Sequence, residues 1–80
     1  MKKKAEQNAA FGRVIRQIRK RRGLTQEGLA FKSGVDRTYI SLLELGSCSP
    51  TLDTIVLLCQ ALEVSLSSLF ALVEEEPRLP

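Results

Sequence analysis

The chain contains no histidine among its 80 residues. Histidine is the commonest general base in enzymes and the commonest metal ligand, so its absence excludes Ser-His and Cys-His catalytic arrangements. The sequence also lacks a phosphate-binding loop and a pair of catalytic carboxylates. We therefore expect a protein that is not an enzyme and that uses neither a metal nor a cofactor.

Cysteines and long apolar segments are also scarce. Cys48 and Cys59 are too few for a disulfide framework, and their spacing is not that of a metal-binding pair. We interpret the first as a loop thiol and the second as a small buried apolar side chain. No apolar run approaches the roughly 18 residues of a membrane span. The lysines at positions 2–4 are not followed by the apolar segment of a signal peptide, so we expect a cytoplasmic protein.

The formal net charge is only +3, but the charges are unevenly distributed. Residues 1–49 contain eleven Lys or Arg and four Asp or Glu, whereas residues 50–80 contain one arginine and five acidic residues. The first part suits a polyanion such as nucleic acid, and the second part suits a separate partner surface. A solvated charged surface without any partner is the alternative interpretation.

The length allows one domain, and a domain this small gains stability by dimerising. We place it at residues 8–73, between a basic arm at residues 1–7 and an acidic tail at residues 74–80. Four residues of the type that begins helices are present: Thr25, Asp36, Thr51 and Ser65. Together with helical spacing of apolar residues, they predict an all-α fold with helices over residues 8–22, 26–33, 37–45, 52–62 and 66–73.

The second and third predicted helices are separated only by Gly34, Val35 and Asp36. So short a link forces the two helices to cross steeply, as in a helix-turn-helix unit. A helical wheel of the third helix places Ile40 and Leu43 on its inner side. The opposite side is therefore available for a partner.

A recognition helix of this kind enters the major groove of DNA and reads base edges with its outward side chains. Arg37 can contact guanine with two donors, Thr38 can offer a hydroxyl or meet a thymine methyl, and Ser41 can donate or accept. Phosphate contacts would come from the N-terminus of the second helix, at Thr25 and Gln26.

Tyr39 has two possible roles near the start of the third helix. Its hydroxyl could bind a phosphate or its ring could contact a base step, and the alternative is a half-buried aromatic that packs on the domain.

The segment Leu24–Ser41, which reads LTQEGLAFKSGVDRTYIS, resembles the helix-turn-helix of the lambda-repressor and Cro-like (XRE-type) family. Residues 52–54 and 61–65 resemble the fourth helix of that family and the turn into the fifth. Within the family, residues 36–41 are similar to the recognition helix of restriction–modification controller proteins, which are short dimers that regulate their own operon. The resemblance implies a regulator that binds a palindromic DNA operator as a dimer.

The same resemblance implies roles for individual residues. Gln26 would bind phosphate, and the groove-facing residues would be Arg37, Thr38 and Ser41. Arg19 and Glu44 would form an ion pair. An exposed pair contributes only about 0–1 kcal/mol, so its use would be to orient the recognition helix.

The sequence departs from the family pattern at four positions: Gly28, Leu42, Leu45 and Cys48. The two leucines stand where relatives often carry polar or basic residues, which leaves three roles open. They could meet thymine methyls, with Leu42 among the base-reading residues, pack on the following loop, or form an exposed apolar patch. An exposed apolar patch would favour a second function, in which a protein of this fold binds another protein such as RNA polymerase or a toxin.

The last predicted helix supplies the expected dimer interface, at Leu66, Phe70 and Val73, with Leu69 in the core. A two-fold dimer would set two recognition helices about 34 Å apart on one side of the duplex. The alternative is that these side chains only close the core.

Overall fold

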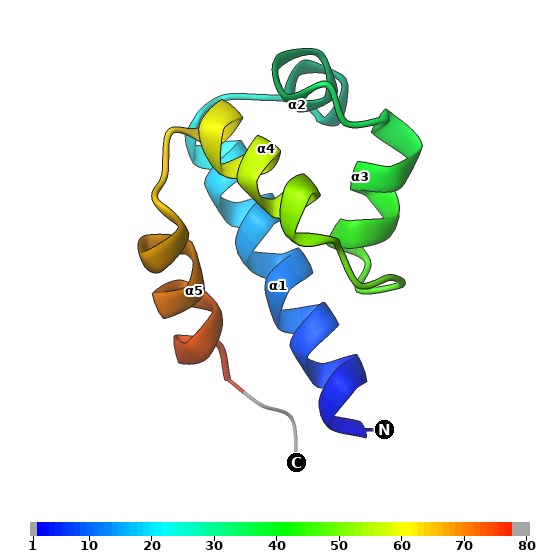
Figure 1. Cartoon of the computed structure of the whole chain (residues 1–80), viewed down its shortest axis with the longest axis vertical. Helices are drawn as coiled ribbons and strands as arrows, with labels where there is room; N and C mark the ends of the chain where they lie inside the picture. The colour runs from blue at the N-terminus through cyan, green and yellow to red at the C-terminus, as the bar shows by residue number, and fades with distance from the viewer. Residues whose placement is uncertain (1, 78–80) are drawn as a thin grey trace.

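The computed structural model describes the backbone of residues 2–77 and the side chains of residues 6–77. This part of the chain forms five α-helices and no strand, which confirms the predicted all-α fold (Figure 1). The helices are α1 (Lys2–Arg21), α2 (Gln26–Ser33), α3 (Arg37–Glu44), α4 (Leu52–Leu62) and α5 (Leu66–Glu75).

The predicted caps begin the last four helices. Thr25 Oγ1 accepts a hydrogen bond from the backbone N–H of Gly28 at 2.9 Å, and the Asp36 carboxylate accepts one from Thr38 at 3.0 Å. Thr51 and Ser65 act in the same way for α4 and α5. Each bond satisfies a donor that has no partner within its own helix.

Two boundaries differ from the predicted ones. Helix α1 begins at Lys2 rather than near Asn8, so residues 2–7 of the predicted arm continue the helix. No glycine or proline interrupts residues 2–10, and their lysines, alanines, glutamate and glutamine favour helix.

Helix α5 likewise continues to Glu75, into the predicted acidic tail. Glu76 caps its C-terminus with an extended backbone, because the following Pro77 disfavours helical geometry in the residue before it. Residues 78–80 of the predicted tail lie outside the described residues.

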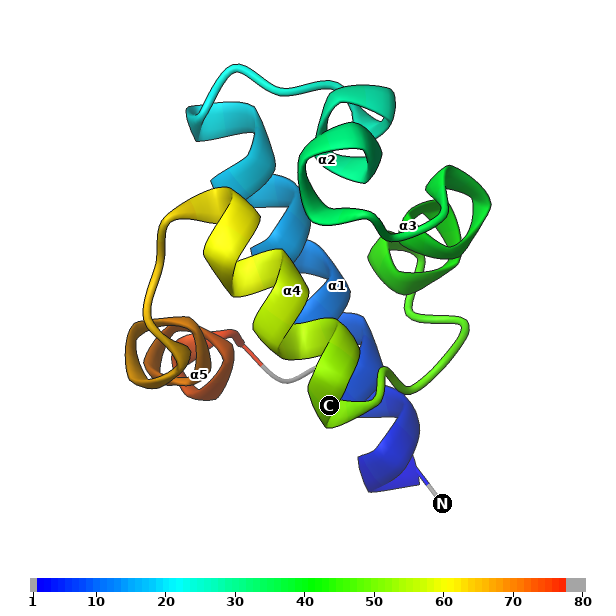
Figure 2. The ribbon, with the colours of Figure 1, turned by 45° about the horizontal axis from the view of Figure 1, so that its top comes forward.

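The core draws side chains from every helix. Fully buried examples are Ile15 of α1, Leu29 of α2, Ile40 of α3, Leu58 of α4 and Leu69 of α5. Helices α3 and α5 pack on opposite sides of α1, as the two ribbon views show (Figures 1 and 2). The predicted recognition helix α3 and the predicted dimer helix α5 therefore lie on separate surfaces of one small domain.

The C-terminal end of α3 lies unusually close to α1. A Cβ atom added to Gly12 would lie 2.2 Å from the carbonyl oxygen of Leu43, and one added to Gly46 would lie 2.9 Å from the Cα of Ala9. These are backbone contacts that only glycine permits. The close contact at Gly12 was not predicted from the sequence, although a glycine inside a helix is itself a signal of close approach.

Within the described residues, no single helix is both long and apolar enough to cross a membrane. Helices α4 and α5 reach that composition only as a pair, and they meet at an angle of 100°.

Candidate nucleic-acid interface

The outward side of α3 carries the predicted base-reading residues. Arg37, Thr38 and Leu42 are exposed, and Ser41 is half-buried. Ile40 and Leu43 on the inner side are 0% and 1% exposed, as the helical wheel predicted. Among the described residues, the Arg37 side chain has no hydrogen-bond or ion-pair partner. The fold therefore presents a ridge whose polar groups are available to an external ligand.

A buried ion pair fixes the base of this ridge. Arg19 Nε and Nη2 donate to the two carboxylate oxygens of Glu44 at 2.6 and 2.9 Å, and Arg19 Nη1 donates to the carbonyl oxygen of Leu24 at 2.8 Å. The ion pair that the resemblance implied is thus present. The pair is buried and not exposed as expected, because the side chains of Arg19 and Glu44 are only 9% and 4% exposed.

The two hydrogen bonds between Arg19 and Glu44 also affect the pKa of Arg19. The hydrogen bond from Arg19 to Glu44 raises the pKa of the guanidinium further above its ordinary value, and burial acts in the opposite direction. Arg19 therefore remains charged at every pH at which the protein is folded. The pair ties α1 to α3 and does not act as a titratable switch.

Gln26 lies at the first position of α2 and joins the same network. Its Nε2 donates to Glu44 Oε1 at 3.1 Å, so one amide hydrogen of this predicted phosphate ligand already has a partner. The carboxamide has a second N–H. The neighbouring Thr25 hydroxyl serves as the cap of α2 by accepting a hydrogen bond, which leaves its own hydrogen available.

Tyr39 is half-buried and packs against the core. Its hydroxyl donates to the carbonyl oxygen of Ser49 at 3.5 Å, and burial together with the neighbouring Cys48 raises the pKa of the hydroxyl. The side chain thus contacts the loop that follows α3, which agrees with the packing alternative.

Neither of the two unusual leucines is fully covered by the protein. Leu45 is 73% exposed and Leu42 is 40% exposed. An exposure of this size excludes packing of Leu45 on the following loop. For Leu45, contact with thymine methyls and contact with a protein partner remain as the two interpretations, and for Leu42 packing on the loop remains as well.

The predicted dimer residues lie on α5 with mixed burial. Leu69 is fully buried, whereas Leu66 and Phe70 are 38% and 40% exposed, and Val73 is half-buried. The Phe70 ring also packs on Phe11 of α1, with ring centroids 6.5 Å apart. Phe70 and Val73 therefore contact the core, and all three side chains still present apolar surface.

Comparison with known proteins gives a consistent result. Residues 15–69 match the helix-turn-helix family model. The chain is 39% identical over 66 residues to the uncharacterized HTH-type transcriptional regulator y4dJ of Sinorhizobium fredii, covering 82% of this chain and 86% of that protein. It is 44% identical over 55 residues to control protein C.BamHI of Bacillus amyloliquefaciens, covering 68% of each chain.

A solved structure extends the likeness to three dimensions. The restriction–modification controller protein C.Esp1396I, crystallised as a tetramer with its natural 35 base-pair operator, superposes with a TM-score of 0.80 at 39% identity. The match covers 86% of this chain and 91% of that one. The family match, the sequence identities and the shared fold together establish that this chain belongs to the helix-turn-helix family, of the lambda-repressor-like (XRE) type that has restriction–modification controller proteins among its members.

Proposed function

We propose that this chain is a sequence-specific transcriptional regulator that binds a palindromic double-stranded DNA operator as a dimer and controls a restriction–modification operon. The observation that carries the proposal is the ridge on α3, where Arg37 and Thr38 are exposed while the buried Arg19–Glu44 pair holds the other side of the helix. Its action requires no catalysis, metal or cofactor, and it takes place in the cytoplasm, where operator DNA and RNA polymerase are found.

In this proposal, the residues that contact base edges are Arg37, Thr38, Ser41 and Leu42. The planar guanidinium of Arg37 matches the two acceptors of guanine in the major groove, and Leu42 can meet a thymine methyl. Phosphate binding falls to the N-terminus of α2, through its backbone N–H groups, the hydroxyl of Thr25 and the second N–H of Gln26. The hydroxyl of Tyr39 adds a phosphate contact from the loop side of α3 by exchanging its 3.5 Å hydrogen bond to the carbonyl oxygen of Ser49 for one to the phosphate.

Dimerisation follows from the number of bases that one ridge can read. A single recognition helix contacts only a few base pairs, which is too little information to select an operator among genomic competitors. Two copies that pair through α5 would present two ridges, and the tetrameric operator complex of C.Esp1396I supports assembly on DNA. The apolar side chains for this pairing are Leu66, Phe70 and Val73.

Replacement of Arg37 by alanine should remove discrimination at one base of each half-site. Loss of a two-donor contact to guanine reduces the preference by about 1–3 kcal/mol, while binding to random DNA falls much less. The measurement is a competition titration by fluorescence anisotropy, after the operator has been selected from a random duplex pool.

Lys32→Ala provides the matched control, because Lys32 is an exposed cation of α2 that borders Leu57 and Gln60 of α4 and not the outward side of α3. A wild-type chain that selects no palindromic duplex over random DNA would contradict the proposed function itself. An Arg37→Ala variant with unchanged preference would contradict only the role of Arg37.

The exposed leucines of α3 favour one alternative function, a protein-binding module with a partner such as RNA polymerase or a toxin. Leu42→Ser with Leu45→Arg should weaken operator binding less than tenfold if the ridge binds DNA mainly through its polar groups. A gel-shift titration beside a pull-down distinguishes the two functions. Loss of a protein partner with operator binding intact would favour the module.

A further inference from the structure

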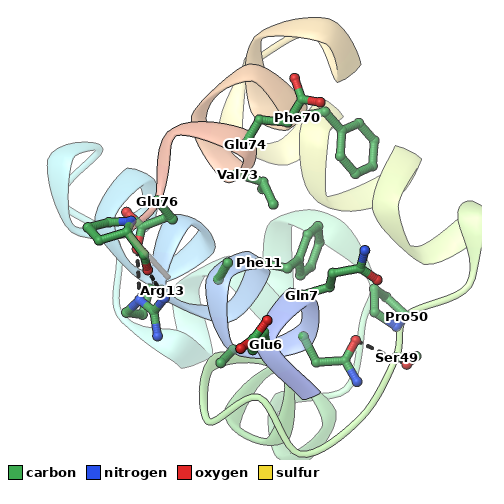
Figure 3. Close-up of a pocket in the computed structure, with 14 residues that line it drawn as sticks. Glu6, Gln7, Phe11, Arg13, Ser49, Pro50, Phe70, Val73, Glu74 and Glu76 are labelled. Atoms are coloured by element: carbon green, nitrogen blue, oxygen red, sulfur yellow. Dashed lines mark hydrogen bonds and ion pairs between the residues drawn. The ribbon is translucent and has the colours of Figure 1, made fainter. Parts of the chain in front are cut away.

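A cavity of about 780 Å³ opens between α1, α5 and the loop that follows α3 (Figure 3). Its apolar walls come from Ala10 and Phe11 of α1, Pro50 of the loop, and Phe70 and Val73 of α5. The ion pair between Arg13 Nε and Glu76 Oε1, at 2.7 Å, lies at one side of the opening (Figure 3). The cavity thus joins the dimer helix to the loop beside the recognition helix.

The α5 surface alone is too small for a stable dimer. An aromatic side chain buries about 150–250 Å² when fully covered, so Phe70, which is 40% exposed, has less than about 100 Å² left to cover. Leu66 and Val73 are smaller and no more exposed. The three together offer about a quarter of the roughly 800 Å² that each partner of a standard interface contributes. A stable dimer must therefore use surface beyond these side chains.

The chain has an exposed apolar side chain close to the cavity in sequence. Leu52 is 66% exposed in the first turn of α4, two residues after Pro50, which lines the cavity. In a two-fold dimer, each partner uses the same surface, so a projecting side chain and a cavity on that surface fill each other reciprocally. Phe70 cannot be the projecting group, because it forms the cavity wall and packs on Phe11.

We propose that the cavity is the receptor site of the dimer, and that it takes Leu52 of a second copy of this chain. This inference rests on the proposed function for the existence of a dimer, and it assigns the residues that hold the dimer together. Each dimer then contains two Leu52 contacts, so the interface extends from α5 across the cavity to the first turn of α4.

The proposal is tested by measuring the dissociation constant of the dimer without DNA, by sedimentation equilibrium. Leu52→Ser should raise this constant at least about tenfold, because two buried leucine contacts are lost per dimer. Leu57→Ser is the matched control, since Leu57 is also an exposed leucine of α4 but lines a separate hollow beside Lys32 of α2 instead of following Pro50, and its effect should stay within about twofold.

A second variant tests the cavity from the opposite side. Ala10→Phe fills the space from its α1 wall and should also raise the constant at least about tenfold, whereas Ala71→Phe on the exposed side of α5 should not. Isotope-filtered NOE spectra of mixed wild-type dimers should show contacts between Leu52 methyl groups and the Phe70 ring of the other copy. They need no substitution, so they decide the result even if a variant does not fold.

The outcomes separate this inference from the proposed function. A wild-type dimer that binds the operator, but that tolerates Leu52→Ser within twofold and shows no such NOE, overturns the cavity assignment and leaves the function intact. A wild-type chain that is monomeric at all concentrations and does not select DNA overturns the function as well.

Discussion

Replacement of Gly12 by alanine should destabilise the protein by about 3 kcal/mol, at the upper end of the range for overpacking in a core. The new Cβ would lie 2.2 Å from the carbonyl oxygen of Leu43 and 2.8 Å from that of Glu44. Both neighbours are backbone atoms, so no side chain can rotate to make room. Thermal unfolding followed by circular dichroism should show a midpoint lower by roughly 12–24 °C for a domain of this size.

Gly28→Ala is the matched control for this substitution. Gly28 also lies in a helix, but its added Cβ would meet only side-chain atoms, the nearest being Thr25 Oγ1 at 3.3 Å. The higher helix propensity of alanine should make this variant as stable as the wild type or more stable by up to about 1 kcal/mol. If the two variants had equal stability, the close contact between α1 and α3 would not exist as described.

The Gly12 substitution also has a consequence for DNA binding. Relief of the clash requires α1 and α3 to separate by roughly 1 Å, since ordinary contacts of a Cβ begin near 3.4 Å. A recognition helix displaced by that amount no longer aligns its donors with base edges, because hydrogen bonds are sensitive to small changes in distance and angle. Operator affinity of Gly12→Ala should therefore fall even at temperatures where the variant is folded.

Removal of one partner of the Arg19–Glu44 pair should have the second large effect. Both side chains are nearly buried, so Glu44→Ala leaves the Arg19 charge without its counter-ion and should cost about 3–5 kcal/mol. Urea denaturation at constant pH measures this loss. A cost below about 1 kcal/mol, which is typical of exposed ion pairs, would contradict the burial of the pair.

The double variant Arg19→Met with Glu44→Leu separates stability from orientation. Because apolar residues of similar volume often replace a buried ion pair without loss, this variant should recover most of the stability. It should not recover operator binding, since Gln26 Nε2 also donates to Glu44 and would lose its fixed position at the start of α2. Full recovery of operator affinity would show that the pair contributes stability alone.

Local features of the sequence were sufficient to predict the helices and the inner side of the recognition helix. Thr25 and Asp36 begin helices through bonds to residues two or three positions away, so their effect is visible in the sequence. Ile40 and Leu43 point inward because of the helical repeat alone. The start of α1 was predicted wrongly because no stop signal marks it, and helix-favouring residues continue to Lys2.

The sequence by itself therefore determined the helix-turn-helix unit, its caps and the polar ridge of α3, because each depends on residues within one or two helical turns. Only the tertiary structure decided that the Arg19–Glu44 pair is buried, that Gly12 lies against Leu43, and that a cavity opens between α1 and α5. These features join segments 25 or more residues apart, as for Arg19 and Glu44. Their burial and distances depend on how whole helices pack, which no local pattern records.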